Sequence, residues 1–222
     1  MIKVEKTEVW GFEHAIRGMR NPKNSWDRSD TLLCGNIDNP DLILGQNDLN
    51  LMRQLYKGGS EHRKYLRQIF VSMDITAPLY WWKEFDTYKV GTTADSCSTM
   101  HKIQSKKFGR EDFSCEHLEE HNLHILDTVI TTLNTERDNY NFGKLKSQWW
   151  QMIQLLPSSY NQKRTVTFTY ENVVSMIRQR SGHKLDEWRN FVEILKDLPY
   201  VREITDEADN IRRVEEDSKA ES

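Results

Sequence analysis

The chain has 222 residues and a formal net charge of −3, from 31 lysines and arginines against 34 aspartates and glutamates. This length suffices for one domain with its own core, and the near-neutral balance excludes the strongly basic surface typical of proteins that bind nucleic acid or anionic membranes. The three cysteines lack paired spacing and no apolar run could span a bilayer, so we expect a cytoplasmic protein with neither a nucleic-acid nor a membrane partner.

Hydrophobic periodicity in the N-terminal part predicts a mixture of strands and helices. In chain order we expect a strand over residues 2–10, a helix over 12–20, a loop over 21–30, a helix over 47–57 and a strand over 65–76. The second of these helices is expected to have Asp48 as its N-terminal cap and to stop at the Gly58-Gly59 pair.

The C-terminal part is predicted to be mainly helical. After a polar connection over 102–112 we expect a helix over 113–133, a loop over 135–144, a helix over 145–156, a strand over 164–170 and helices over 171–182 and 185–200. Residues 205–222 are charged and lack aromatic side chains, which predicts a disordered tail behind a single domain over residues 1–204.

The stretch from Ala77 to His101 changes composition halfway along its length. Its first part is apolar and aromatic, as expected for a buried helix, whereas the part after Gly91 is rich in hydroxyl side chains. Hydroxyls and backbone N–H groups beside a cation are what a phosphate group needs, so this part predicts an anion site. A polar surface turn would have the same composition. The residues concerned are Lys89, Thr92, Thr93, Ser96, Cys97, Ser98 and His101.

A metal site is an alternative suggested by Cys115, His117, His121 and His124. The three histidines are spaced to share one face of the helix predicted over 113–133. Three ligands on one helix rarely converge on a single ion, and the HExxH pattern is absent from the sequence, so no metal is expected. Cys97 is open to two interpretations, a nucleophile or a small buried hydrophobic residue, and the second is favoured.

The stretch from Ala77 to His101 also resembles the flavin-dependent thymidylate synthases, the ThyX-type enzymes. That family has an A-P-x-x-x-x-x-Q-x-x-R-H-R segment followed by a loop of the form S-x-N-E-x-S-x-R-Y. Here Ala77-Pro78 is followed by Glu84 at the place of the glutamine and by Thr87-Tyr88-Lys89 at the place of R-H-R. With one inserted residue, Ser98 takes the place of the loop serine and Met100 that of the arginine.

A second stretch resembles the same family over a longer span. The family has a leucine-proline pair, a Y-T-x-x-x-W-T-x-N-x-R strand, a helix that ends in L-R and a glutamine-tryptophan pair. This chain has Leu156-Pro157, the sequence YNQKRTVTFTYE, a helix that ends in Gln179-Arg180, and Glu187-Trp188. Thr169 and Glu171 stand where the strand pattern has Asn and Arg. The resemblance covers residues 1 to about 200.

The resemblance implies an α+β fold with a central, mostly antiparallel sheet and flanking helices. It implies a homotetramer, FAD bound at Thr87, Tyr88 and Lys89, and a pyrimidine nucleotide such as dUMP as substrate. It also implies NADPH and methylenetetrahydrofolate as co-reactants, if the family reaction is retained. The phosphate or nucleotide would contact Ser96, Ser98, His101, Arg178 and Arg180, with Ser98 and Arg180 as the catalytic residues.

Two functions therefore follow from the sequence. The first is an enzyme that methylates or otherwise modifies the C5 position of deoxyuridylate with the help of flavin. The second is a non-catalytic protein on the same scaffold that binds a nucleotide or another protein, as a sensor or a sequestering factor. The missing arginines at residues 87–89 motivate the second function, because each lost charge-assisted hydrogen bond weakens the binding of an anion.

Overall fold

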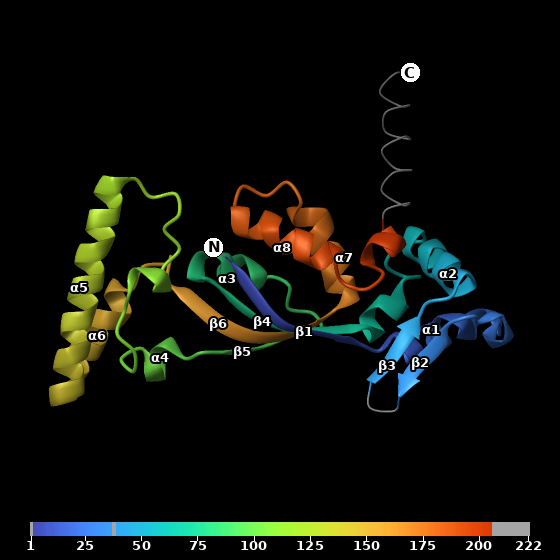
Figure 1. Cartoon of the computed structure of the whole chain (residues 1–222), viewed down its shortest axis with the longest axis horizontal. Helices are drawn as coiled ribbons and strands as arrows, with labels where there is room; N and C mark the ends of the chain where they lie inside the picture. Colours follow the sequence, from blue (N-terminus) through green and yellow to red (C-terminus); the bar gives the residue numbers. More distant parts are fainter. Residues whose placement is uncertain (1, 37–38, 206–222) are drawn as a thin grey trace, which may run out of the picture. The chain divides into compact units, whose positions relative to one another are not determined.

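The computed structural model describes residues 2–36 and 39–205 (Figure 1). The strands of this part are β1 (Lys3–Trp10), β2 (Leu32–Asn36), β3 (Asn39–Ile43), β4 (Phe70–Pro78), β5 (Thr93–Ser96) and β6 (Asn161–Thr169). Its α-helices are α1 (Phe12–Arg20), α2 (Gln46–Lys57), α3 (Leu79–Phe85), α4 (Thr99–Lys102), α5 (Glu120–Gly143), α6 (Lys146–Leu155), α7 (Tyr170–Arg180) and α8 (Asp186–Lys196). Its short 3-10 helices are η1 (Asn21–Lys23), η2 (Trp26–Arg28), η3 (Lys64–Gln68) and η4 (Arg110–Asp112).

Strands β1, β4, β6 and β5 form, in that order, an antiparallel sheet, and β2 and β3 form a separate antiparallel hairpin. The α+β class with a central antiparallel sheet and flanking helices, expected from the sequence, is therefore confirmed. Among residues 2–36 and 39–205, no helix combines the length and the apolar character that crossing a membrane requires.

The chain forms two compact units, each assembled from separate stretches of sequence. The first unit contains residues 2–7, 73–89 and 93–166, and the second contains 8–36, 39–72, 90–92 and 167–205. Strands β1, β4 and β6 each contribute residues to both units. The boundary predicted at residue 204 stays a prediction, and the predicted tail lies, from residue 206 onward, outside the described residues.

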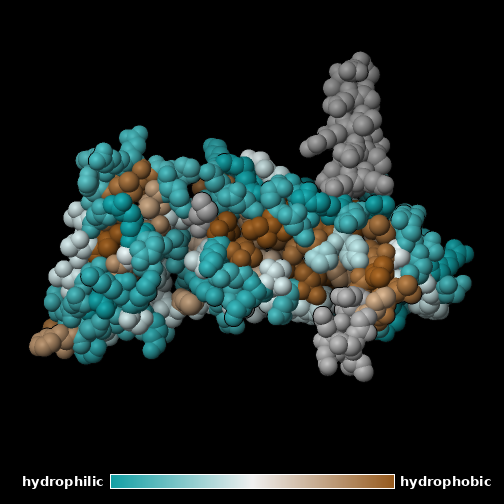
Figure 2. All heavy atoms as spheres, viewed as in Figure 1, coloured by the Kyte–Doolittle hydropathy of each residue, from teal (hydrophilic) through white to brown (hydrophobic). Residues whose placement is uncertain are grey.

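In the first unit, α5 and α6 pack together over an apolar cluster made of Ile103, Phe108, Phe113, Leu126, Ile130, Leu133 and Met152. In the space-filling view, hydrophilic residues cover most of the visible surface of these two helices (Figure 2). Helix α3 buries Trp81, Trp82 and Phe85, and the Trp82 indole N–H donates to the Gln162 carbonyl at 2.9 Å. This bond fixes the end of α3 against β6, directly before the stretch rich in hydroxyl groups.

The core of the second unit is aromatic. Tyr170, at the start of α7, is buried; its ring meets Phe12 edge to face and its hydroxyl donates to the Pro199 carbonyl at 2.8 Å. Trp188 and Phe191 of α8 are also completely buried. These contacts explain the amphipathic patterns from which helices were predicted over 171–182 and 185–200.

Three predicted boundaries are wrong. The strand predicted over 65–76 begins only at Phe70, because residues 64–68 form η3, in which the neighbouring residues Tyr65 and Leu66 are both buried. Helix α5 begins at Glu120, because the backbone at Phe113 instead forms a β-bridge with Tyr160. It then continues through the loop predicted over 135–144, because the Asn134 side chain bonds the Phe108 backbone and does not end the helix.

Candidate functional site

The stretch after Gly91 forms an edge strand, β5, and not the loop that its composition suggested. Two hydrogen bonds join Cys97, the residue after β5, to strand β6. The Cys97 N–H donates to the Lys163 carbonyl, and the Gln162 side-chain amide donates to the Cys97 carbonyl, each at 2.9 Å. Ser98 then caps α4, its Oγ accepting from the His101 N–H at 3.0 Å. The cap occupies an oxygen lone pair, so the Ser98 O–H can still donate to a ligand.

The turn that precedes β5 is fixed within the second unit. The Asn172 side-chain amide donates to the Val90 carbonyl at 2.9 Å and to Thr92 Oγ1 at 2.8 Å. Gly91 between them has φ of +72°, a conformation that residues with a side chain rarely adopt. Its Cβ position also lies 3.2 Å from a methyl carbon of Thr169, so even alanine would be crowded there.

Ser98 lines a cavity of about 260 Å³ in the first unit. Cations dominate its charged lining, which consists of Lys102, Lys106, Lys107, Lys163 and a single carboxylate, Asp112. Thr99, Ser105, Cys97, Tyr160 and Gln162 are among the other lining residues. This space is called the lysine cavity.

Two of the four lysines are held by carboxylates. Lys106 donates to Asp112 at 2.7 Å and Lys163 lies 2.9 Å from Asp74, and these hydrogen bonds raise the pKa of both ammonium groups. Lys102 and Lys107 are exposed and form no ion pair with the residues that the structure describes. The cavity therefore presents uncompensated positive charge beside the Ser98 hydroxyl.

Tyr160 forms one wall of the lysine cavity and packs edge to face against Phe113 and Phe108. Burial raises the pKa of its hydroxyl, so the phenol stays neutral and does not repel an anion. The wall thus offers an aromatic surface and a neutral polar group.

The residues predicted to hold FAD lie in the turn after α3, outside the lining of the lysine cavity. The Thr87 hydroxyl donates to the Glu84 carbonyl at 2.7 Å, and the Tyr88 N–H donates to the Phe85 carbonyl at 3.0 Å. The Lys89 side chain is exposed. Thr87 therefore closes the end of α3 with the hydroxyl that was predicted to contact a cofactor.

The other predicted contacts divide between the two units. In the first unit, Ser96 and His101 are exposed and lie outside the lining of the lysine cavity, in contrast to Ser98. In the second, Arg178 is exposed, and the Arg180 guanidinium lies 4.9 Å from the centre of the Trp188 ring. It stays a prediction that these four residues act in one site with Ser98.

The structure changes the interpretation of the histidine cluster and of Cys97. His117 precedes α5, so it does not share a helix face with His121 and His124. Within the described ranges, no three His, Cys, Asp or Glu side chains are grouped to hold a metal ion. Cys97 is exposed and lines the lysine cavity, so its interpretation as a buried hydrophobic residue is wrong.

The fold matches solved structures of ThyX. One is the crystal structure of flavin-dependent thymidylate synthase ThyX from Helicobacter pylori complexed with FAD and dUMP, with a TM-score of 0.66 and 16% sequence identity, over 92% of this chain and 98% of that one. A second structure of the Helicobacter pylori enzyme with FAD and dUMP gives the same TM-score and identity, over 93% of this chain and 98% of that one. No protein-family model and no curated protein sequence matches the chain. At this identity the likeness shows a ThyX-like fold.

Proposed function

We propose that this protein binds a pyrimidine nucleotide such as dUMP, with the phosphate group in the lysine cavity. The observation that carries the proposal is the uncompensated charge of Lys102 and Lys107 beside the Ser98 hydroxyl. A nucleotide phosphate needs cations and hydrogen-bond donors of this kind. The ThyX-like fold supports the choice of nucleotide, since the similar structures from Helicobacter pylori hold dUMP.

Each lining group has a defined part in the proposed complex. Lys102 and Lys107 attract the phosphate, Ser98 donates its O–H, and Asp112 positions the Lys106 ammonium group. The cavity volume of about 260 Å³ lies just below the usual range of small-molecule sites, which begins at about 300 Å³, and this suits a mononucleotide better than a dinucleotide. We further propose that Arg178 and Arg180 contact the nucleotide within a homotetramer, in which subunits share each site.

The residues at the place of the family's R-H-R motif do not fit the pyrophosphate of FAD. They supply one exposed cation, Lys89, and the Thr87 hydroxyl already donates to the backbone. A lysine cannot form the planar, two-pronged contact that an arginine makes with phosphate. No reaction step is therefore assigned to flavin, and nucleotide binding is the function that the residues support best.

Flavin-dependent modification at C5 of deoxyuridylate is the second candidate function. It is favoured by the similarity to ThyX structures that contain FAD together with dUMP. It would also require NADPH and methylenetetrahydrofolate. A visible spectrum of the purified protein, recorded with and without added FAD, separates the two functions. We expect no bound flavin at high micromolar FAD, whereas a bound yellow flavin that NADPH bleaches would establish the second function.

Calorimetric titration with dUMP tests the nucleotide site. Ser98→Ala is expected to weaken dUMP binding by about tenfold, because one hydrogen bond to a charged group is lost. Ser98→Thr keeps the hydroxyl and should restore binding. Ser158→Ala removes an exposed serine hydroxyl of the same unit outside the cavity and should leave affinity unchanged. Equal affinity in the wild type and Ser98→Ala would show that the phosphate lies elsewhere.

A further inference from the structure

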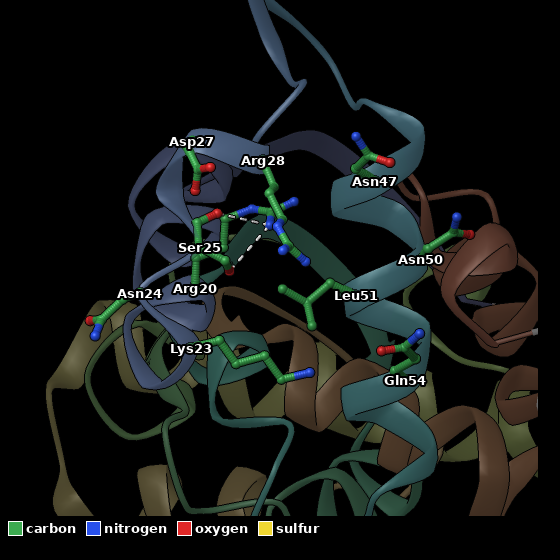
Figure 3. Close-up of a pocket in the computed structure, with 10 residues that line it drawn as sticks. All are labelled: Arg20, Lys23, Asn24, Ser25, Asp27, Arg28, Asn47, Asn50, Leu51 and Gln54. Carbon is green, nitrogen blue, oxygen red and sulfur yellow. Dashed lines mark hydrogen bonds between the residues drawn. The ribbon is translucent and has the colours of Figure 1, made fainter.

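The second unit contains a larger polar cavity of about 510 Å³, far along the sequence from Ser98 (Figure 3). One side is formed by the last residue of α1, Arg20, and by the stretch that links α1 to β2, which contributes Lys23 and Arg28. The other side is helix α2, which contributes Asn47, Asn50, Leu51 and Gln54. This space is called the arginine cavity.

Arg20 is the central residue of the arginine cavity and has an unused donor. Its side chain is almost fully buried; Nε donates to Asp48 Oδ1 at 2.6 Å, and Nη1 donates to the Ser25 carbonyl at 3.1 Å. Its Nη2 is buried and has no hydrogen-bond partner among the residues that the structure describes. Buried N–H groups nearly always have an acceptor, so Nη2 gives Arg20 a hydrogen-bonding capacity that the described residues do not use.

The charge around Arg20 favours an anionic acceptor. Asp48 compensates Arg20 from outside the cavity lining, but it also accepts hydrogen bonds from Ser29 and Thr31. The lining adds Lys23 and Arg28, both exposed and without an ion pair in the described part of the chain. Figure 3 shows their side chains extending toward the space in front of α2. Because Asp48 already neutralises Arg20, the excess charge is that of Lys23 and Arg28 less that of Asp27, the single carboxylate of the lining, which leaves one positive charge.

The opposite wall offers neutral hydrogen-bonding groups. Gln54 and Leu51 extend from α2 toward the cavity, and Asn47 lies at its edge (Figure 3). The side-chain amides of Asn47 and Gln54 have no hydrogen-bond partner within residues 2–36 and 39–205. An amide both donates and accepts, so this wall suits hydroxyl groups of a ligand.

We propose that the arginine cavity is a second ligand site, which binds a phosphorylated, hydroxyl-rich small molecule of the sugar phosphate class. The excess positive charge attracts the anionic phosphate, which contacts Arg20, Lys23 and Arg28, while the hydroxyl groups face Asn47 and Gln54. The cavity volume lies within the range of small-molecule sites. This site is independent of the proposed nucleotide site, which lies in the other unit.

The test uses ribose 5-phosphate as the probe, in the full chain that carries Lys102→Glu and Lys107→Glu. These two changes make the lysine cavity repel phosphate, so any remaining binding is assigned to the second unit. By calorimetry we expect one site per chain, with inorganic phosphate binding more weakly than ribose 5-phosphate and ribose not binding. Adding Lys23→Gln and Arg28→Gln to this protein should weaken its binding of ribose 5-phosphate by at least about tenfold, since two charged contacts are removed.

The matched control is Lys57→Gln together with Lys64→Gln, which removes two exposed charges of the same unit outside the cavity. The affinity of this control for ribose 5-phosphate should equal that of the parent, the full chain with only Lys102→Glu and Lys107→Glu. Lys23 and Arg28 are exposed, so their replacement leaves the fold intact, which a melting curve verifies. Absence of ribose 5-phosphate binding to the parent, or equal binding after Lys23→Gln and Arg28→Gln, would overturn the proposal.

Discussion

Asp48→Asn is expected to lower the free energy of unfolding by about 3 to 5 kcal/mol, the usual effect of removing one partner from a buried ion pair. The Asp48 side chain is completely buried. It accepts from Arg20 at 2.6 Å, from the hydroxyls of Ser29 and Thr31 at 2.7 Å, and from the Asp30 and Thr31 N–H groups at 3.1 Å. Asparagine replaces an acceptor oxygen with an NH₂ group that faces these donors, and it leaves the Arg20 charge without a counter-ion.

The same carboxylate should make stability depend on pH in the acidic range. Burial alone would raise the pKa of Asp48, but hydrogen bonds from Ser29, Thr31 and Arg20 outweigh burial and lower it below its ordinary value. A carboxyl group whose pKa is lower in the folded state stabilises the protein above its unfolded pKa. That contribution is lost as the pH falls below about 4, through the folded pKa. The wild type should therefore lose more stability on acidification than Asp48→Asn does.

Urea unfolding at neutral pH and at a series of acidic pH values measures both effects. Asp27→Asn is the matched control, because Asp27 is an exposed aspartate of the same unit, and its effect should stay within about 0.5 kcal/mol. If Asp48→Asn unfolds within about 1 kcal/mol of the wild type, Asp48 does not anchor this region as the hydrogen bonds indicate.

Reversing two charges in the lysine cavity is the second large expected effect. Lys102→Glu with Lys107→Glu should weaken dUMP binding by more than about 100-fold, which corresponds to about 2.8 kcal/mol. The change turns two attractive contacts with a dianionic phosphate into two repulsive ones, and each is worth about 1 kcal/mol or more at 4 Å, even in water. Both lysines are exposed and unpaired within the described residues, so the fold should be preserved.

Calorimetric titration at low and moderate salt measures this loss. The control is Lys83→Glu with Lys146→Glu, which makes the same change in net charge on exposed residues of the same unit outside the cavity. The control should bind within about twofold of the wild type, because screening removes most of the effect of distant charges. An equal loss of affinity in both double variants would mean that net charge acts, and not a phosphate site in the lysine cavity.

Local patterns were enough to predict most of the helices and the core strand β6. Each of these elements buries one face of its own sequence. This burial produces the alternation in RTVTFTY and the amphipathic spacing of α7 and α8. The edge strand β5 was missed because Thr93–Ser96 are all exposed and, apart from the small Ala94, polar, so the strand carries no hydrophobic alternation. Its conformation comes from pairing with β6, which is distant in sequence.

The candidate site was predicted only in part, for the same reason. Ser98, which lines the lysine cavity, was among the predicted residues because a serine near the end of a hydroxyl-rich stretch is a local signal. Lys102, Lys106 and Lys107 were assigned to a polar connection, and their approach to Tyr160 and Lys163 depends on long-range folding. Asp48 was predicted to be a helix cap, whereas Gly45 occupies the cap position and Asp48 pairs with Arg20 across 28 residues. Hydrophobic periodicity contains no information about an ion pair between residues so far apart in the sequence.

The discontinuous composition of the two units also sets an order for folding during synthesis. The first unit has all of its residues once position 166 has left the ribosome, whereas the second, which begins at residue 8, must wait for residues 167–205. Until α7 emerges, Phe12 of α1 lacks its partner Tyr170, although η3, which also packs against α1, has already been made. The nascent N-terminal half therefore carries an incomplete core, whose exposed apolar surface favours aggregation until residues 167–205 are made.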